Sequence, residues 1–235
     1  MQLTRLLDWS GRLLPLLLLL HVSVRAQGQD AALSRTLLVK LTPQYVVVSG
    51  YWLEVEKSWN QHPRQSVTFT PQFYAGPTGQ PDALTTASST TNSKETVRGA
   101  GVQVQHRLYL TTTKAQYPAG LYVSYGPNLQ HFAVSGREIG WRQVLGPTGL
   151  PQYEYSNGPR PETINRYGAT AQMGYQAPLH PGRVFLDLYA GVGWRASTSR
   201  SGSETIESQY QSGPSDYGHE GLYFPAGFKI GVALQ

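Results

Sequence analysis

The sequence predicts an all-β protein: an eight-stranded, antiparallel, up-and-down transmembrane β-barrel. Eight stretches alternate between apolar residues and polar or small residues, which is the period of a strand because successive side chains point to opposite faces. The connections between these stretches alternate between short and long, as in outer-membrane barrels. Charged residues make up 14% of the chain, well below the roughly 25% typical of soluble domains.

Residues 184–195, VFLDLYAGVGWR, show the pattern most clearly. Every even position is apolar, whereas the odd positions include Asp187, Arg195 and two glycines. The stretch is close to the roughly 9–11 residues that a tilted strand needs to cross a bilayer. We therefore expect one of its faces to meet lipid.

The N-terminus has the features of a secretory signal peptide. Arg5 and Arg12 flank a basic region, residues 13–20 are apolar apart from Pro15, and small residues end the segment at Ala26. We assign residues 1–26 to the signal, 27–34 to a short periplasmic lead and 35–235 to the barrel. Without the signal the formal charge falls from +5 to +3, and no basic run suggests a nucleic-acid partner.

The eight predicted strands follow in chain order. They are residues 36–48, 51–58, 65–75, 100–110, 120–132, 164–176, 184–195 and 222–234. Ser49-Gly50 is expected to form a tight hairpin. Short turns are expected at 59–64, 111–118 and 177–182, and long loops at 76–98, 135–162 and 197–220.

The alternation alone does not say which face of the barrel is outside. A soluble, lipocalin-like binding barrel also has eight alternating strands, with the apolar face inward. The polar face here is rich in glycine and poor in charge, which suits a crowded lumen better than a surface in water. Aromatic residues near the strand ends are typical of the girdles at membrane interfaces; they are Tyr45, Tyr51, Phe73, Tyr125, Tyr167, Tyr175, Trp194 and Phe224. The soluble barrel stays as an alternative.

Four segments carry a resemblance to a known group. They are YWLEVEKSW at 51–59, GAGVQVQHRLYL at 99–110, FLDLYAGVGWR at 185–195 and FKIGVALQ at 228–235. The chain resembles the small outer-membrane barrels of the OmpA-transmembrane and OmpX type, and short barrels of diderm bacteria that directly follow a signal peptide. The resemblance implies a monomer in the bacterial outer membrane, surrounded by its lipid, with extracellular loops and both termini periplasmic. It also implies that the barrel assembly machinery reads the last strand.

Charged residues at inward positions predict a filled lumen. Strand direction places six of them in its middle and lower parts: Lys40, Glu54, Glu56, Arg107, Asp187 and Lys229. Three acids and three bases can satisfy one another where a lone ion would be strongly disfavoured. Asp187 and Lys229 are expected nearly opposite each other on neighbouring strands. Two further bases, Arg166 and Arg195, are expected near the outer mouth.

Aromatic and arginine residues in the long loops are candidate contacts for an unknown extracellular ligand, because binding surfaces favour these side chains. They are Arg137, Trp141, Arg142, Tyr153, Tyr155, Tyr210 and Tyr217. Simple solvated loops with incidental aromatic residues are the competing interpretation.

The sequence shows no catalytic, cofactor-binding or metal site. It has no cysteine, no histidine pair with zinc spacing and no acidic calcium loop. His106 and His131 fall at lipid-facing positions without a complete nucleophile, base and orienting group. We expect a barrel with a structural or loop-mediated binding role rather than an enzyme. A narrow channel and a lipid-modifying enzyme are the alternatives.

Overall fold

The computed structural model describes residues 37–59, 62–78, 95–110, 118–180, 183–201 and 217–234. Its strands are β1 (Leu37–Leu41), β2 (Gly50–Trp59), β3 (His62–Pro77), β4 (Thr96–Tyr109), β5 (Gly120–Leu145), β6 (Pro151–His180), β7 (Val184–Ser201), β8 (Gly221–Tyr223) and β9 (Ala226–Leu234). The expected signal peptide and periplasmic lead lie outside the described residues. Among those described, no helix is both long and apolar enough to span a bilayer.

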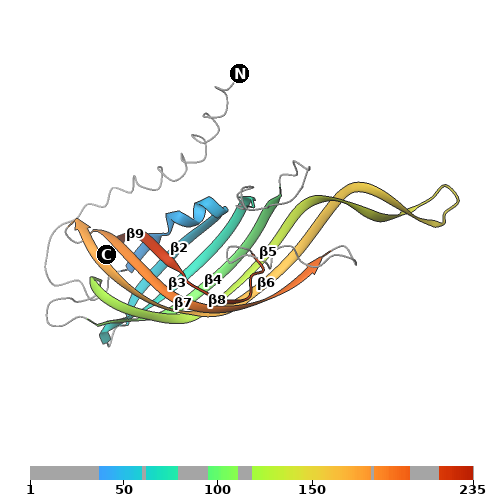
Figure 1. The fold of residues 1–235 in the computed structure, drawn as a ribbon. Helices are drawn as coiled ribbons and strands as arrows, with labels where there is room; N and C mark the ends of the chain where they lie inside the picture. Colours follow the sequence, from blue (N-terminus) through green and yellow to red (C-terminus); the bar gives the residue numbers. More distant parts are fainter. Residues whose placement is uncertain are drawn as a thin grey trace, which may run out of the picture. The chain divides into compact units, whose positions relative to one another are not determined.

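The strands form one antiparallel ring (Figure 1). Neighbours in sequence pair from β1 to β7, and β9 lies between β7 and β1 and pairs with both. The three-residue β8 continues the line of β9 along β7, so the ring has eight strand positions. The prediction of an eight-stranded antiparallel up-and-down ring is confirmed. We call the end with the β2–β3, β4–β5 and β6–β7 connections the base, and the opposite end the rim.

The first strand is shorter than the alternation predicts. β1 ends at Leu41, and Pro43–Val48 form a 3-10 helix, η3, with the proline in its first turn. Proline supplies the φ of a helical turn and no N–H for a strand ladder, so the apolar residues at 43, 45 and 47 do not extend β1. Ser49, with φ 56°, closes the helix in place of the expected Ser49-Gly50 hairpin.

The segment 135–162, expected to be a loop, is a β-ribbon. β5 pairs with β4 only as far as Ser135, and β6 pairs with β7 only from Glu162. Between these points β5 and β6 continue to pair with each other up to Leu145 and Pro151. This ribbon runs well beyond the other strands in Figure 1. The loop prediction was wrong because polar residues on both ribbon faces hide the strand period.

The ribbon closes at the sequence GPTG, residues 146–149. The N–H of Gly149 donates to the carbonyl of Gly146 at 2.9 Å, and Gly149 has φ 77°, which glycine adopts without strain. The last predicted strand is interrupted as well. Phe224 and Pro225 separate β8 from β9, since proline cannot donate to a ladder.

The two faces of the ring have opposite character. Side chains that point into the lumen are buried and mostly polar, including Lys40, Glu54, Thr68, Gln105 and Asp187. Side chains on the outer wall are apolar and exposed; among them are Leu53, Phe69, Phe73, Leu129, Tyr167, Met173, Leu188, Val192, Trp194, Ile230 and Val232. This arrangement is the reverse of a lipocalin-like barrel, in which the apolar face lines the interior.

Apolar clusters occupy both ends of the lumen. Near the base, Leu38, Tyr109, Tyr122 and Phe185 are buried against one another. Near the rim the buried cluster consists of Tyr74, Val97, Phe132, Val134, Ile164 and Tyr217, with Trp52 packed against it. The polar interior therefore lies between two apolar layers.

The ribbon makes no strand pairs with the ring, so removing it should leave the ring intact. We expect replacement of residues 137–159 by Asn-Gly, which favours a two-residue hairpin turn, to preserve folding in detergent. The measurement is the shift in electrophoretic mobility between unheated and boiled samples. Gly168→Leu is the destabilising control, because a Cβ there would lie 2.2 Å from the Trp194 carbonyl oxygen. Loss of the folded band in the deletion variant would contradict ribbon independence.

Candidate functional site: a charge network in the lumen

Six charged side chains from five strands meet in the lower lumen. Lys40 lies on β1, Glu54 and Glu56 on β2, Arg107 on β4, Asp187 on β7 and Lys229 on β9. Antiparallel pairing sets their level, with Lys40 opposite Glu54 and Asp187 opposite Lys229. Each is at most 5% exposed. The structure thus brings together all six residues that parity and strand direction placed in the middle and lower lumen.

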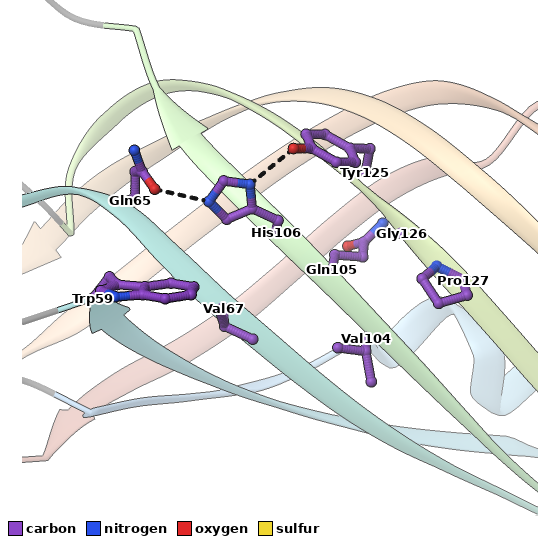
Figure 2. Close-up of a pocket in the computed structure, with 9 residues that line it drawn as sticks. All are labelled: Trp59, Gln65, Val67, Val104, Gln105, His106, Tyr125, Gly126 and Pro127. Atoms are coloured by element: carbon purple, nitrogen blue, oxygen red, sulfur yellow. Dashed lines mark hydrogen bonds between the residues drawn. The ribbon is translucent and has the colours of Figure 1, made fainter. Parts of the chain in front are cut away.

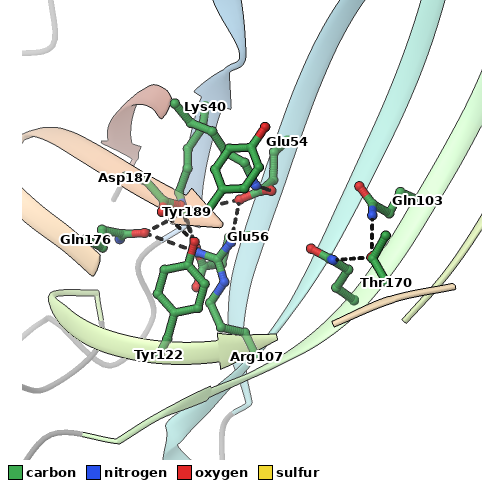
Figure 3. A network of polar contacts seen from close by, with 12 residues as sticks. Lys40, Glu54, Glu56, Gln103, Arg107, Tyr122, Thr170, Gln176, Asp187 and Tyr189 are labelled. Atoms are coloured by element: carbon green, nitrogen blue, oxygen red, sulfur yellow. Dashed lines mark hydrogen bonds and ion pairs between the residues drawn. The ribbon is translucent and has the colours of Figure 1, made fainter. Parts of the chain in front are cut away.

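Lys40 and Arg107 are the two hubs of the network (Figure 3). The Lys40 Nζ lies 3.1 Å from Glu54 Oε1, 2.5 Å from Glu56 Oε2 and 2.9 Å from Asp187 Oδ2. Arg107 contacts the same three carboxylates at 3.1, 2.8 and 3.2 Å. Lys40 and Arg107 are therefore each shared among three acids, and each acid contacts at least two bases.

Neutral side chains complete the hydrogen bonding of the carboxylates. The Tyr109 hydroxyl donates to Glu56 at 2.7 Å and Ser66 to the same oxygen at 2.6 Å. The Tyr122 hydroxyl donates to Asp187 at 2.5 Å, and the Arg107 guanidinium lies 3.9 Å from the centre of the Tyr122 ring. Gln176 accepts from Lys40. Sequence analysis did not single out these residues. They could have been found, because they lie at inward-facing positions close to the charged residues of the network.

The ion pairs of Asp187 and Lys229 differ from the expected one. The two residues are register partners. However, Asp187 bonds to Lys40 and Arg107, and the Lys229 ammonium contacts Glu54 and lies 4.8 Å from the centre of the Tyr189 ring. Register fixes the Cα positions, whereas long side chains reach across the lumen to non-neighbouring strands.

Arg166 and Arg195 lie above this network, toward the rim. Arg166 donates to Gln130 at 2.7 Å and to the Tyr217 carbonyl at 3.1 Å. The Arg195 guanidinium lies 4.6 Å from the centre of the Tyr223 ring. These two bases are held by aromatic rings and amide or carbonyl oxygens and are separate from the six-residue network.

Between the two levels the lumen is lined by amides and hydroxyls. Gln103 and Gln105 both donate to Thr170 at 2.9 Å. Several buried polar atoms here have no hydrogen-bond partner within the described part of the chain: Thr68 Oγ1, Thr70 Oγ1, Gln72 Nε2, Gln105 Oε1, Ser124 Oγ and Gln172 Oε1. These lumen amides and hydroxyls are therefore not all bonded to one another within the described residues.

The helix η3 turns two side chains into the upper lumen. The Gln44 amide donates to the Tyr189 hydroxyl at 2.9 Å, and the Tyr45 ring stacks on Trp52 with centroids 3.7 Å apart. Gly227 provides the space, since a Cβ there would lie 1.9 Å from Gln44 Nε2. The alternation had placed Tyr45 in a strand at the membrane interface; the structure places it inside.

The candidate loop contacts divide into two groups. Trp141 and Tyr155 are cross-strand partners on the ribbon with ring centroids 5.4 Å apart, and both are exposed, as are Arg137 and Tyr153, whereas Arg142 is half-buried. Tyr217 is not exposed: it packs against Tyr74 and Phe132 in the rim cluster. In this structure the Tyr217 ring therefore lies inside the rim cluster and not on an exposed loop surface. Tyr210 lies outside the described residues.

His106 and His131 are on the outer wall. His131 Nδ1 lies 2.7 Å from Asn165 Oδ1, and His106 lies between Tyr125 and Gln65. Within the described residues no group of three or more His, Cys, Asp or Glu side chains is arranged to hold a metal ion.

Comparisons with known proteins give distant structural likenesses alone. No protein-family model matches the chain, and no curated protein matches it. Among solved structures, the Acinetobacter baumannii proteins CarO2 and CarO are similar to it. CarO2 has 12% identity and a TM-score of 0.38, covering 85% of this chain and 97% of its own. CarO has 10% identity and a TM-score of 0.37, covering 88% and 99%.

The network predicts strong coupling between its members. Arg107→Met leaves three buried carboxylates with two bases, and we expect a loss of about 3–5 kcal/mol in the free energy of unfolding. Adding Glu56→Gln restores two acids and two bases, so the double variant should lose less than the sum of the single variants by about 1 kcal/mol or more. Urea titrations in detergent measure both quantities.

Arg98→Met on the same strand is the matched control, because Arg98 is exposed. It should change the free energy of unfolding by no more than about 0.5 kcal/mol. Simple additivity of Arg107→Met and Glu56→Gln would show that the two side chains do not act as parts of one network.

Proposed function

We propose that this chain is an integral β-barrel protein of the bacterial outer membrane, with a closed lumen and a binding role at its rim. The observation that supports it is the inverted distribution of side chains: Lys40, Glu54 and Asp187 are buried, whereas Leu129, Met173 and Trp194 are at least half exposed. In water this distribution would expose a continuous apolar wall. In a bilayer the same wall is covered by lipid, and closure of the ring through β9 gives β1 and β7 a strand partner that an open sheet would lack.

Aromatic residues on the outer wall support the same proposal. Tyr51, Phe73, Tyr167 and Trp194 are exposed on the rim half, and Trp59 and Tyr175 on the base half. Amphipathic rings prefer the level of the lipid head groups, so these residues fit two interfacial girdles. We assign the rim to the extracellular side and the base, with both termini, to the periplasm, because long connections of such barrels face outward.

The ribbon is the proposed binding element. Trp141 and Tyr153 are each 70% exposed, and Tyr155 is 61% exposed. Rigid aromatic side chains on a projecting two-stranded element provide contact area at low entropic cost. Outer-membrane lipid and, during insertion, the barrel assembly machinery are the other proposed partners of a monomeric, non-enzymatic protein.

A narrow channel for small solutes is the second candidate function. The polar lining of the mid-lumen, in which several Gln and Thr atoms have no partner within the described residues, favours it. The six-residue network below that lining opposes it, because the network fills the cross-section with paired side chains. The two candidates share one fold and differ in whether the network ever opens.

Introducing a charged residue on the outer wall tests whether that wall is inserted in a membrane. Leu129 is 57% exposed and pairs with Val102, midway along β4, whereas Leu145 lies on the same strand at the ribbon tip. We expect Leu129→Arg to lower the stability of the barrel in liposomes by about 2–4 kcal/mol. Leu145→Arg, the matched control, should change it by less than about 0.5 kcal/mol. Equal effects, or a monomer recovered from the periplasm without detergent, would contradict insertion.

Conductance in planar bilayers separates the two candidate functions. We expect no steady ion conductance from the wild type, because paired side chains close the lower lumen. Replacing one ion pair by small residues, Glu56→Ser with Arg107→Ser, should produce a measurable conductance. A steady, large conductance from the wild type would favour the channel.

A further inference from the structure

A hollow on the outer wall combines apolar and polar side chains (Figure 2). It lies across β3, β4 and β5 and has a volume of about 510 Å³, within the range of about 300–1,000 Å³ of small-molecule sites. Short side chains form its floor, namely Val67, Val104 and Pro127, and the larger rings of Trp59 and Tyr125 stand at its edge.

One end of the hollow is polar. His106 Nδ1 lies 3.0 Å from the Tyr125 hydroxyl, and His106 Nε2 lies 3.1 Å from Gln65 Oε1. Because an amide oxygen only accepts, Nε2 carries a proton and donates to Gln65. The amide nitrogen of Gln65 therefore faces away from His106. Polar side chains on a lipid-facing wall are rare and mark functional sites.

The polar and apolar parts of the hollow are ordered along the barrel axis. His106 is three residues from the end of β4 at the base, and its register partner is Tyr125. Val67 is the register partner of His106 on β3, whereas Val104 and Pro127 lie two residues farther from the base, or about 7 Å along a strand. Trp59, the last residue of β2, is 51% exposed beside His106, with ring centroids 6.3 Å apart. The polar end therefore lies at head-group level and the apolar end toward the bilayer centre.

We propose that this hollow binds one glycerophospholipid, with an acyl chain against Val67, Val104 and Pro127 and the phosphate or ester group at Gln65, His106 and Tyr125. The proposal rests on the proposed membrane location, which places the hollow in the periplasmic leaflet. The Gln65 amide nitrogen supplies a hydrogen-bond donor that an apolar wall lacks. The Tyr125 hydroxyl donates to His106 Nδ1, and the lone pairs that remain on its oxygen give this end of the hollow a polar acceptor as well.

The test counts phospholipid molecules retained by the purified, folded barrel. The probe is palmitoyl-oleoyl-phosphatidylethanolamine added to the protein in detergent, and native mass spectrometry measures the lipid-bound fraction. Val104→Trp fills the floor of the hollow. We expect it to lower the bound fraction about tenfold, equivalent to about 1.4 kcal/mol. Its matched control is Val192→Trp on β7, since the two valines are 39% and 43% exposed.

A second pair of variants tests the polar end. His106→Leu should lower retention of the phospholipid to a similar extent, whereas His131→Leu, which removes the other outer-wall histidine bonded to an amide oxygen, should not. Diacylglycerol, which has the acyl chains without the phosphate, should be retained less than the phospholipid by the wild type. Equal retention of both lipids would assign recognition to the chain alone and overturn the head-group part of the proposal.

Insertion into liposomes is measured on the same preparations. If all variants insert and all retain phospholipid equally, the lipid site is wrong and the membrane proposal stands. If the wild type does not insert, the membrane proposal fails and the lipid site fails with it.

Discussion

The constraint on which the structure depends is that six buried charges must satisfy one another. A single uncompensated ion in a dry interior costs several kcal/mol, so the three acids and three bases tolerate no independent displacement. Lys40 and Arg107 each contact Glu54, Glu56 and Asp187. These contacts join β1, β2, β4 and β7 across the lumen, between strands that are not all neighbours in the ring. The network therefore favours a single register of the ring.

An interior of this kind requires an unusual exterior. A soluble domain is stabilised mainly by burying apolar side chains, but here the lumen holds ions, amides and hydroxyls. The apolar residues that remain lie on the outer wall and in the two small clusters at the ends of the lumen. The same two-residue period thus builds a polar inside and an apolar outside, which suits a ring surrounded by lipid.

The two ends of the ring differ in complexity. The base has short connections and the apolar cluster around Tyr109 and Tyr122. The rim has η3 folded against Trp52, the buried Tyr217 and the long ribbon of β5 and β6. The elaboration of the ring is therefore concentrated at the rim, whereas the described part of the base consists of strand ends and one small apolar cluster.

The sequence by itself determined the number of strand positions, which residues share a face and the membership of the charge network, because a period of two assigns every side chain to one of two faces without knowledge of tertiary contacts. The glycine-rich, charge-poor composition of the polar face favoured that face as the lumen, and the structure confirmed it. Tertiary structure decided where strands end and which side chains pair, because the alternation of residues specifies neither. Pro43 and Pro225 end ladders that the apolar pattern continues, and pairing with a partner strand turns the polar segment 135–162 into a ribbon. The ion pairs were also decided in three dimensions. Asp187 and Lys229 are register partners, yet their side chains bond to other residues, since long side chains choose partners across the lumen by distance and charge.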